Sequence, residues 1–368
     1  MAGGPPSADI TYSMPDAQSA ISIAAPLNKD KIRAFLRKDL PNGRIEHEVD
    51  NIKTYLKIYK IAHEAAKFLK KEGYKARVLF PNFRYRKGLK FWQVRSFPPL
   101  SLRYIAVRSG VGSYGWSGNV GIKGYGAPII LGGLVTNAKL DPTPPIPPEE
   151  TFCNKCKLCE KVCPLRMFGG QDQEEYVKLG VYSFSFSKRN HLYRCFASCG
   201  GFTGLDKTGK WSTWSPYRFP YPETTKEVVG VLAKSFTPKI KWYIKDEAKG
   251  YDVNNLRTDV GLTEDEFKTL LSDNKRGLKQ LRSTTLTCGN CQLICWGEPK
   301  ETAENFKILT NSGCDIKMKN EEIVILPADE AKKVYEDMGG YRISLGHKIL
   351  SWVAAKYLYR AEKYFKRE

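Results

Sequence analysis

Apolar residues recur at helical spacing in two long stretches of the chain. Between Glu46 and Lys71 they lie three or four residues apart, and they comprise Val49, Ile52, Leu56, Tyr59, Ala62, Ala66 and Leu69. This spacing places them on one face of a helix, and Gly73 just beyond is typical of a helix C-terminus. The stretch from about Leu345 to Phe365 has the same period, which predicts a second long helix.

Two short apolar runs flank the first of these helices. Residues Ala20–Ala25 precede a proline, and residues Ala76–Phe80 follow the glycine at the helix end. A strand, a long helix and a second strand in that order predict a layer of the α/β or α+β class. We therefore expect an N-terminal α/β domain over residues 16–148.

The other domain boundaries follow from composition. Residues 1–15 are rich in glycine, proline and serine and predict a leader that is disordered or draped on the surface, and a proline-rich linker covers residues 141–148. Cysteines define a second domain in two pieces, residues 149–199 and 285–325. Residues 200–284 form an insertion that is expected to cap the substrate site, and residues 326–368 form a basic helical C-terminal region.

The net charge narrows the classes of partner. The chain has 59 lysines and arginines against 39 aspartates and glutamates, a formal net charge of +20. A field of this size favours anionic partners, such as nucleic acid, an anionic membrane face, an acidic electron donor or an acidic substrate. The C-terminal amphipathic helix is itself basic, so docking on its own domain, on a membrane surface or on a partner all stay open.

Neither a membrane span nor secretion is indicated. No run of about 18 or more apolar residues is present, and the N-terminus lacks the apolar core of a signal peptide. The ten cysteines, most of them in closely spaced runs, indicate a reducing compartment and not a disulfide scaffold. We expect a cytoplasmic protein.

The strongest chemical signal is a run of four cysteines followed by proline. The spacing Cys153-x2-Cys156-x2-Cys159-x3-Cys163-Pro164 is the ligand run of ferredoxin-type [4Fe–4S] clusters. Three close thiolates suit three irons of one cube, and the fourth thiolate usually reaches a second cube. Zinc binding and disulfide formation are the alternatives, but under either one the match of four cysteines and the proline to the cluster motif would be a coincidence.

A second cysteine run, Cys288-x2-Cys291-x3-Cys295, lies far downstream. Two cubes need eight thiolates and the two runs supply seven, so one ligand must come from elsewhere. The remaining cysteines are Cys195, Cys199 and Cys314, and a buried free thiol is the ordinary alternative for each. We expect one cluster on Cys153, Cys156, Cys159 and Cys295, and a second on Cys163, Cys195, Cys288 and Cys291, with Cys199 in reserve.

Aromatic residues gather in the insertion between the two cysteine runs. They include Trp211, Trp214, Tyr217, Phe219, Tyr221, Trp242 and Tyr243, with Arg218 and several lysines nearby. Such residues can line a ligand pocket or stack on nucleic-acid bases, and a plain aromatic core is the alternative.

Eight glycines punctuate residues 112–133, a density that permits either close approach to a ligand or tight turns between strands. The stretch Tyr114-Gly-Trp-Ser-Gly-Asn119 resembles the corrinoid-contacting turn of the cobalamin-dependent two-cluster reductases. The stretch from Tyr125 to Asn137 resembles their glycine-rich strand, and the order of cysteines, with Tyr193-Arg-Cys195 between the runs, is also similar. This family includes epoxyqueuosine reductases and reductive dehalogenases.

The resemblance implies an oxidoreductase that takes electrons from a low-potential donor, a ferredoxin or flavodoxin, and relays them through two [4Fe–4S] clusters. It also implies a corrinoid, cobalamin, between the N-terminal layer and a ferredoxin-like two-cluster domain. An organic substrate, for which an anion is one option, would be reduced or reductively cleaved there. Residues at the matching positions would contact the corrinoid, namely Gly115, Trp116, Gly118, Asn119, Gly126 and Gly132.

The chain departs from the epoxyqueuosine reductases where these carry a general-acid aspartate ahead of the glycine turn. Residues 99–104 contain no acid, so the proton donor is expected to be Tyr104 or a tyrosine such as Tyr182 or Tyr193, with Arg103 lowering the phenol pKa. This departure puts the substrate in question more than the cofactors. An enzyme acting on tRNA, which the positive charge favours, and a non-catalytic electron carrier or activator are the alternatives.

Overall fold

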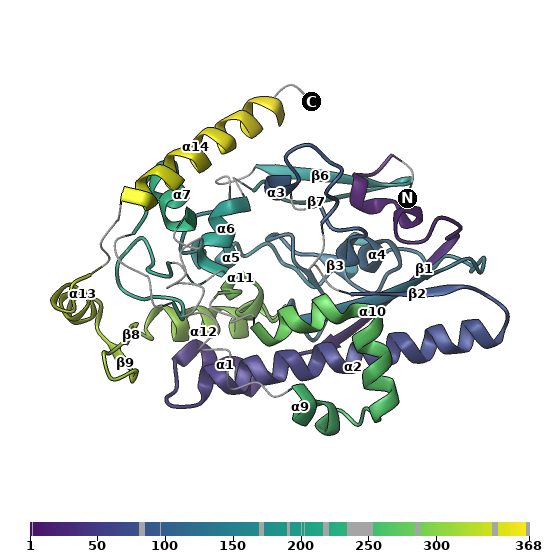
Figure 1. Ribbon diagram of the computed structural model, residues 1–368, viewed down its shortest axis with the longest axis horizontal. Coiled ribbons are helices and arrows are strands. Elements are labelled where there is room, and N and C mark those ends of the chain that lie inside the picture. Colours follow the sequence, from purple (N-terminus) through teal and green to yellow (C-terminus); the bar gives the residue numbers. More distant parts are fainter. Residues whose placement is uncertain are drawn as a thin grey trace.

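The structure is a computed structural model that describes residues 1, 3–80, 85–95, 97–168, 173–189, 192–199, 201, 203–215, 221–233, 253–283, 288–340 and 345–365. Within these ranges the chain forms a mixed α/β arrangement with several small sheets, as Figure 1 shows. None of the described helices is long and apolar enough to cross a membrane.

The largest sheet has three strands in the order β1 (Ser19–Pro26), β5 (Ile129–Thr136) and β2 (Ala76–Leu79). Both outer strands run antiparallel to β5, which is buried along most of its length. The expected strand–helix–strand unit is therefore present. Its two strands are separated by a third strand from the glycine region, about 50 residues further along the chain, which local pattern could not place.

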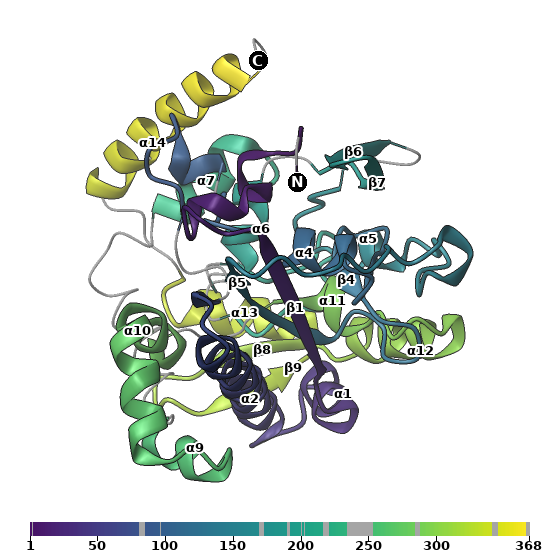
Figure 2. The same ribbon diagram turned by 90° about the vertical axis from the view of Figure 1, so that its right-hand side faces the viewer.

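Helices cover both faces of this sheet. The long helix α2 (Gly43–Lys71), with α1 (Lys29–Arg37) before it, packs on the face of β5 that carries Leu134. Helix α4 (Leu102–Arg108) packs on the opposite face, against Val135, because neighbouring strand residues point to opposite sides. Figure 2 shows α2 and α4 on the two sides of β1 and β5.

The N-terminal segment is ordered where the structure describes it. Two short 3-10 helices, η1 (Pro6–Ala8) and η2 (Ile10–Tyr12), lie there, and Ala8 and Met14 are buried. The Ser7 hydroxyl donates to the Pro98 carbonyl at 2.9 Å, and the Ser7 carbonyl accepts from the Ser101 amide. Of the two alternatives for residues 1–15, the described residues differ from a disordered leader and agree with a segment draped on the surface, because their few apolar side chains pack beside α4.

Short elements surround the cysteine runs. They are α3 (Trp92–Arg95), β3 (Ser113–Tyr114), β4 (Val120–Gly121), η3 (Pro148–Glu150), α5 (Leu158–Lys161), β6 (Glu174–Leu179), β7 (Tyr182–Ser187), α6 (Leu192–Cys199), α11 (Asn290–Leu293), α12 (Pro299–Thr310), β8 (Cys314–Lys317), β9 (Ile323–Leu326) and α13 (Ala328–Asp337). Strands β3 and β4, β6 and β7, and β8 and β9 each form a two-stranded antiparallel sheet. The cysteines of the two runs thus sit on turns and on the short helices α5 and α11, and Cys195 and Cys199 lie in α6.

The first part of the expected insertion belongs to the main core. Trp211 and Trp214 are buried together with Trp296, and the Trp214 indole donates to the Phe35 carbonyl of α1 at 3.0 Å. Further along, α7 (Thr225–Ala233) packs on α14 (Leu345–Phe365), whereas α9 (Val253–Asp259) and α10 (Glu264–Ser283) pack on α2. The other expected aromatic positions, Tyr217, Phe219, Trp242 and Tyr243, lie outside the described residues, as does Arg218.

Candidate functional site

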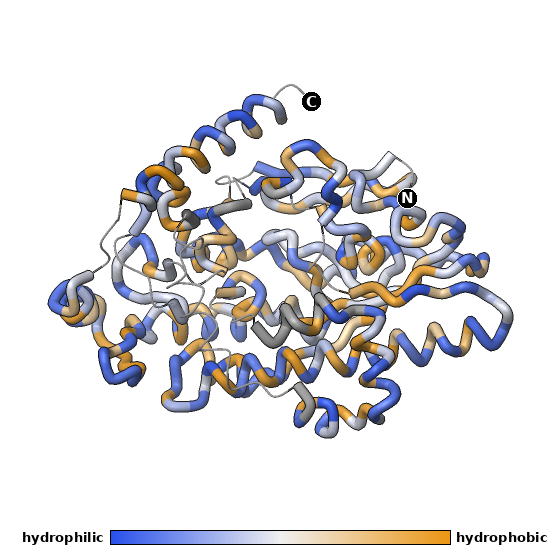
Figure 3. Tube along the Cα trace, in the orientation of Figure 1, coloured by the Kyte–Doolittle hydropathy of each residue, from blue (hydrophilic) through white to orange (hydrophobic). Residues whose placement is uncertain are grey.

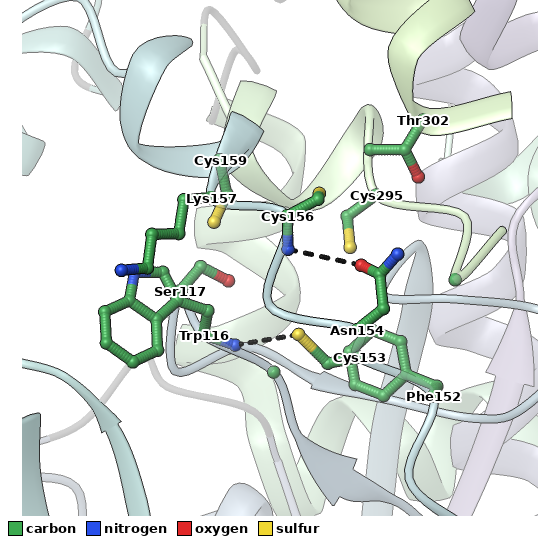
Figure 4. Close-up of a pocket in the computed structure, with 12 residues that line it drawn as sticks. Trp116, Ser117, Phe152, Cys153, Asn154, Cys156, Lys157, Cys159, Cys295 and Thr302 are labelled. Carbon is green, nitrogen blue, oxygen red and sulfur yellow. Dashed lines mark hydrogen bonds between the residues drawn. The ribbon is translucent and has the colours of Figure 1, made fainter. Parts of the chain in front are cut away.

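Four thiols gather around one pocket, shown in Figure 4: those of Cys153, Cys156, Cys159 and Cys295, which we call the first thiol group. Lys155 and Lys157 adopt left-handed backbone, with φ of 56° and 60°, and this folds the cysteine run back on itself. Cys159 is buried and Cys156 is exposed, so the group reaches the surface. Burial, and after it the neighbouring thiols, raises the pKa of Cys295 to about 12.

A second thiol group comprises the thiols of Cys163, Cys195, Cys288 and Cys291, and Cys199 lies with it. Cys163 interacts electrostatically with the other three members. The sulfurs of Cys195 and Cys199 are 3.5 Å apart, one turn along α6, and Cys199 also hydrogen-bonds to Cys288. The Cys199 hydrogen bond lowers the pKa of Cys195 to about 7. The structure therefore brings both expected ligand sets together, and places the reserve cysteine beside the second.

N–H donors point at sulfurs of both groups. The Trp116 amide donates to Cys153 Sγ at 3.2 Å and the Met167 amide to Cys163 Sγ at 3.3 Å. The Asn119 side-chain amide donates to Cys291 Sγ at 3.4 Å. Such donors favour a thiolate over a thiol and are typical of iron–sulfur ligands. Two sets of four thiols with their own donors fit two [4Fe–4S] clusters.

No three metal-binding side chains among the described residues converge closely enough to hold a single metal ion. Thiols that bind a cube attach to four different irons and need not meet at one point.

The glycine turn lies between the two thiol groups. Its Trp116 contacts the first group through the amide described above, and the Trp116 indole donates to Glu160 Oε1 at 2.5 Å. Three residues later, Asn119 contacts the second group. The Ala127 amide also donates to the Cys295 carbonyl at 2.8 Å, so the glycine region docks on the second cysteine run. Two of the residues expected to contact a corrinoid, Trp116 and Asn119, therefore contact the cysteine runs instead.

The glycines of this region approach other parts of the chain closely. A Cβ on Gly126 would lie 2.3 Å from the Trp296 backbone, and one on Gly115 would lie 2.7 Å from the Phe152 ring. A Cβ on Gly132 would overlap the Ile58 side chain of α2, and one on Gly118 would overlap the Arg189 guanidinium. The space that these glycines leave is filled by the protein itself. The glycine positions as placed do not fit a corrinoid, and the corrinoid contacts stay a prediction.

Two arginines converge on the glycine turn beside the second thiol group. Arg189 donates to the Ser117 carbonyl at 3.0 Å and Arg103 to the Gly118 carbonyl at 3.2 Å. The Arg189 Nε atom is buried without a hydrogen-bond partner, and no carboxylate forms an ion pair with either arginine among the described residues. Burial, followed by repulsion from Arg103, lowers the pKa of Arg189. Negative charge nearby would relieve both costs.

Tyr104 and Tyr114 interact electrostatically with both arginines. Burial is the largest effect on Tyr104 and raises its pKa, and Glu175 raises it further, against the opposing effect of Arg189 and Arg103. Arg103 does act to lower the pKa of Tyr104, as expected, but the net shift is upward, which the expectation did not foresee. Tyr104 therefore keeps its proton at neutral pH. The side chain of Tyr193 lies outside the described residues.

Sequence reasoning missed Arg189, Glu160 and the contact between Asn119 and Cys291. Arg189 follows an aromatic strand and resembles any surface cation in sequence, so no local signal distinguishes it. Glu160 lies inside the first cysteine run, and it also accepts from the Ser187 hydroxyl at 2.8 Å. Cys314, the remaining cysteine, lies in β8 within a separate hydrophobic cluster.

Comparison with known proteins supports the resemblance at a distance. No family model matches the chain. A curated epoxyqueuosine reductase from Atelocyanobacterium thalassa (isolate ALOHA) is 28% identical over 158 residues, which are 43% of this chain and 45% of that protein. Over these residues the chain is similar in sequence to an epoxyqueuosine reductase. Because the match spans less than half of that relative's length, its activity, substrate and partners do not transfer with it.

Solved epoxyqueuosine reductases overlap the structure only loosely. The enzyme from Bacillus subtilis aligns with a TM-score of 0.32 at 12% identity, covering 81% of this chain and 84% of that one. A second structure, which contains an epoxyqueuosine-modified tRNA stem loop, aligns with a TM-score of 0.31 at 11% identity over the same shares. The description of the fold rests on the elements themselves.

Proposed function

We propose that this protein is an iron–sulfur oxidoreductase that reduces an anionic organic substrate beside the second thiol group. The observation that supports it most is the pair of four-thiol sets, each with N–H donors, next to two arginines that form no ion pair with a carboxylate of the described residues. The distant relationship to a reductase family agrees with this class of reaction.

The cysteines would hold two [4Fe–4S] clusters, the first on Cys153, Cys156, Cys159 and Cys295 and the second on Cys163, Cys195, Cys288 and Cys291. When bound, such clusters carry single electrons at low potential, here from an external ferredoxin or flavodoxin. The exposed Cys156 puts the first thiol group at the surface, where an electron donor can approach. Arg103 and Arg189 lie beside the second group, so the substrate side is assigned to it.

Arg103 and Arg189 would hold the anionic part of the substrate. Guanidinium groups present several donors in a fixed plane and bind carboxylates or phosphates well. Tyr104, whose pKa is raised, would stay protonated and could donate a proton to the reduced substrate.

A corrinoid is the cofactor that the family resemblance adds. This chain's own atoms occupy the space beside the glycines that would contact a corrinoid. We therefore assign no step of the reaction to a corrinoid. Its presence is decided by measurement.

The first experiment is anaerobic purification with iron, sulfide and cobalt counted per chain, together with an optical spectrum. About eight irons per chain would support the two-cluster assignment, and about four or fewer would contradict it. With eight irons, corrinoid absorbance and bound cobalt would restore the family's cofactor. Eight irons without cobalt, even after added cobalamin, would leave the cluster assignment intact and remove the corrinoid.

The anion site is tested with the reduced protein and a panel of aromatic and aliphatic carboxylates and phosphate esters. We expect at least one of them to perturb the electron paramagnetic resonance of the second cluster. Arg103→Leu and Arg189→Leu should each weaken that effect by about tenfold or more. Arg108→Leu is the matched control, because Arg108 lies on α4 with Arg103 but its guanidinium packs on the Tyr182 ring. Equal weakening by all three variants would argue against the site.

An enzyme acting on tRNA is the second candidate, favoured by the net charge of +20 and by the relative solved with a tRNA stem loop. It predicts tRNA binding that falls steeply with salt concentration, since each neutralised phosphate releases counterions. Binding that is weak, or that barely depends on salt, would exclude it.

A further inference from the structure

Helix α14 presents large apolar side chains to solvent along its first half. Leu345 is 74% exposed, Ile349 55%, Trp352 58% and Val353 51%. These residues lie at helical spacing and therefore share one face. A contiguous apolar face of this kind usually marks an interaction site in a water-soluble protein.

The opposite face of α14 packs against the rest of the protein. Ala354, Ala355 and Leu358 pack on the buried valines of α7, Val228 and Val229. Figure 1 shows α14 at the periphery of the molecule, beside α7 and directed away from the sheet. The exposed face therefore takes no part in the packing of α14 on the described residues of the chain.

The second half of the same face is basic. The helical spacing of Ile349 and Trp352 is continued by Lys356, Arg360 and Lys363. The exposed face therefore changes from apolar to cationic along the helix. Figure 3 shows the change in hydropathy along α14. The Lys356 ammonium lies 3.7 Å from the centre of the Trp352 ring, which joins the two halves. The helix contains four lysines and arginines and a single acidic residue.

A second segment adds cations at the basic end. The Phe91 ring packs on Tyr357 and Tyr364 of α14, with ring centres 5.4 and 5.5 Å apart. This contact brings Lys90 to 4.5 Å and Arg95 to 5.8 Å from the Tyr364 ring. Residues about 270 positions apart in the chain thus supply one cationic patch.

We propose that α14 docks this protein on an anionic lipid surface. The apolar half would enter the boundary between headgroups and acyl chains, and the basic half would face anionic headgroups. The tryptophan–lysine pair in the middle suits that boundary, where amphipathic side chains gather.

Other occupants fit this face less well. A nucleic acid would use the cations but offers nothing to the aliphatic side chains of Leu345, Ile349 and Val353. A second copy of the chain, related by a two-fold axis on this face, would bring the two cationic halves near each other or oppose each with an apolar half. Lipid is the partner that matches both halves.

The test is co-sedimentation of the full protein, purified anaerobically, with large unilamellar vesicles. We expect binding to phosphatidylcholine vesicles with about 30% phosphatidylglycerol, and at least tenfold weaker binding to phosphatidylcholine alone. The double variants I349S/W352S and K356E/R360E should each lose about tenfold or more in affinity for the anionic vesicles. Unchanged iron content and thermal unfolding would show that each variant folds.

The matched control is Val181→Ser, which removes an apolar side chain that is 89% exposed in the turn between β6 and β7. It should bind vesicles as the unaltered protein does. Absence of vesicle binding at low salt, or equal loss in the control, would overturn the proposal. So would a dimer or a tRNA complex that the I349S/W352S variant abolishes while vesicles do not bind.

Discussion

The two thiol groups differ in how their sequence and surroundings build them. The first takes three of its four sulfurs from seven consecutive residues, reaches the surface at Cys156 and has exposed lysines around it. The second draws its sulfurs from three separate segments, and Arg189 and Arg103 lie beside it. The first is a local motif, whereas the second is a product of the tertiary fold.

The difference indicates a direction for electrons. Exposed charges around the first group are screened by water, so that group is suited to meeting an external donor. Arg189 and Arg103 beside the second group are half-buried, so they act through a lower dielectric and stabilise added negative charge. We expect the second cluster to have the higher reduction potential, with electrons passing from the first to the second.

Removing one ligand from each group should have the largest effect. Cys159→Ser and Cys291→Ser should each lower iron from about eight to about four per chain, because each cube depends on its own four thiolates. Iron and sulfide analysis of anaerobically purified protein measures this. Cys314→Ser is the control, since Cys314 packs in β8, and it should keep all of the iron. Loss of all iron from either variant would mean that the groups do not assemble independently.

Cys195 and Cys199 are the two candidates for the eighth cluster ligand. Both sulfurs face the second group, 3.5 Å apart. We expect Cys195→Ala to lose the second cluster and Cys199→Ala to keep it, as iron content and the spectrum of the reduced protein would report. The reverse result would exchange the two assignments, and full iron in both single variants would show that either cysteine can serve.

The arginine beside the second group should set its potential. Replacing Arg189 with Leu removes a buried positive charge near Cys291 and should lower the potential of the second cluster by about 50–100 mV. Lys155→Leu, next to the first group, is the matched control and should shift its cluster by less than about 20 mV, because Lys155 is exposed and already pairs with Glu174 at 2.9 Å. Redox titration followed by electron paramagnetic resonance measures the reduction potentials of both clusters. Similar shifts in the two variants would remove the contrast between the groups.

The smallest effect is expected from the amide of Asn119. Asn119→Leu removes the donor to Cys291 Sγ while keeping the volume, and should lower the potential of the second cluster by about 20–40 mV. The first cluster should keep its potential, which the same titration measures. A larger shift in the first cluster than in the second would show that Asn119 acts by positioning the glycine turn.

Long-range placement explains where sequence reasoning succeeded and where it failed. The bounds expected for the C-terminal helix match α14, and the helix expected from Glu46 to Lys71 matches α2 to within its first turn, because side-chain periodicity is a local property. The sequence left a disordered and a surface-draped leader open, because the apolar neighbours of Ala8 and Met14 lie far along the chain. The corrinoid contacts came from a short motif, whose glycines the structure places against Phe152, Arg189, Trp296 and Ile58.

The sequence by itself determined the chemistry of the ligands, because three thiolates at fixed short spacing can serve one cluster whatever surrounds them. It also determined the amphipathic character of α14, which follows from the period of its residues. Only the tertiary structure decided that Arg189 and Arg103 converge on Ser117 and Gly118, that Asn119 reaches Cys291, and that Lys90 joins the cations of α14. These contacts join residues that are distant along the chain, and their free energy depends on burial and charge that exist only once the chain has folded.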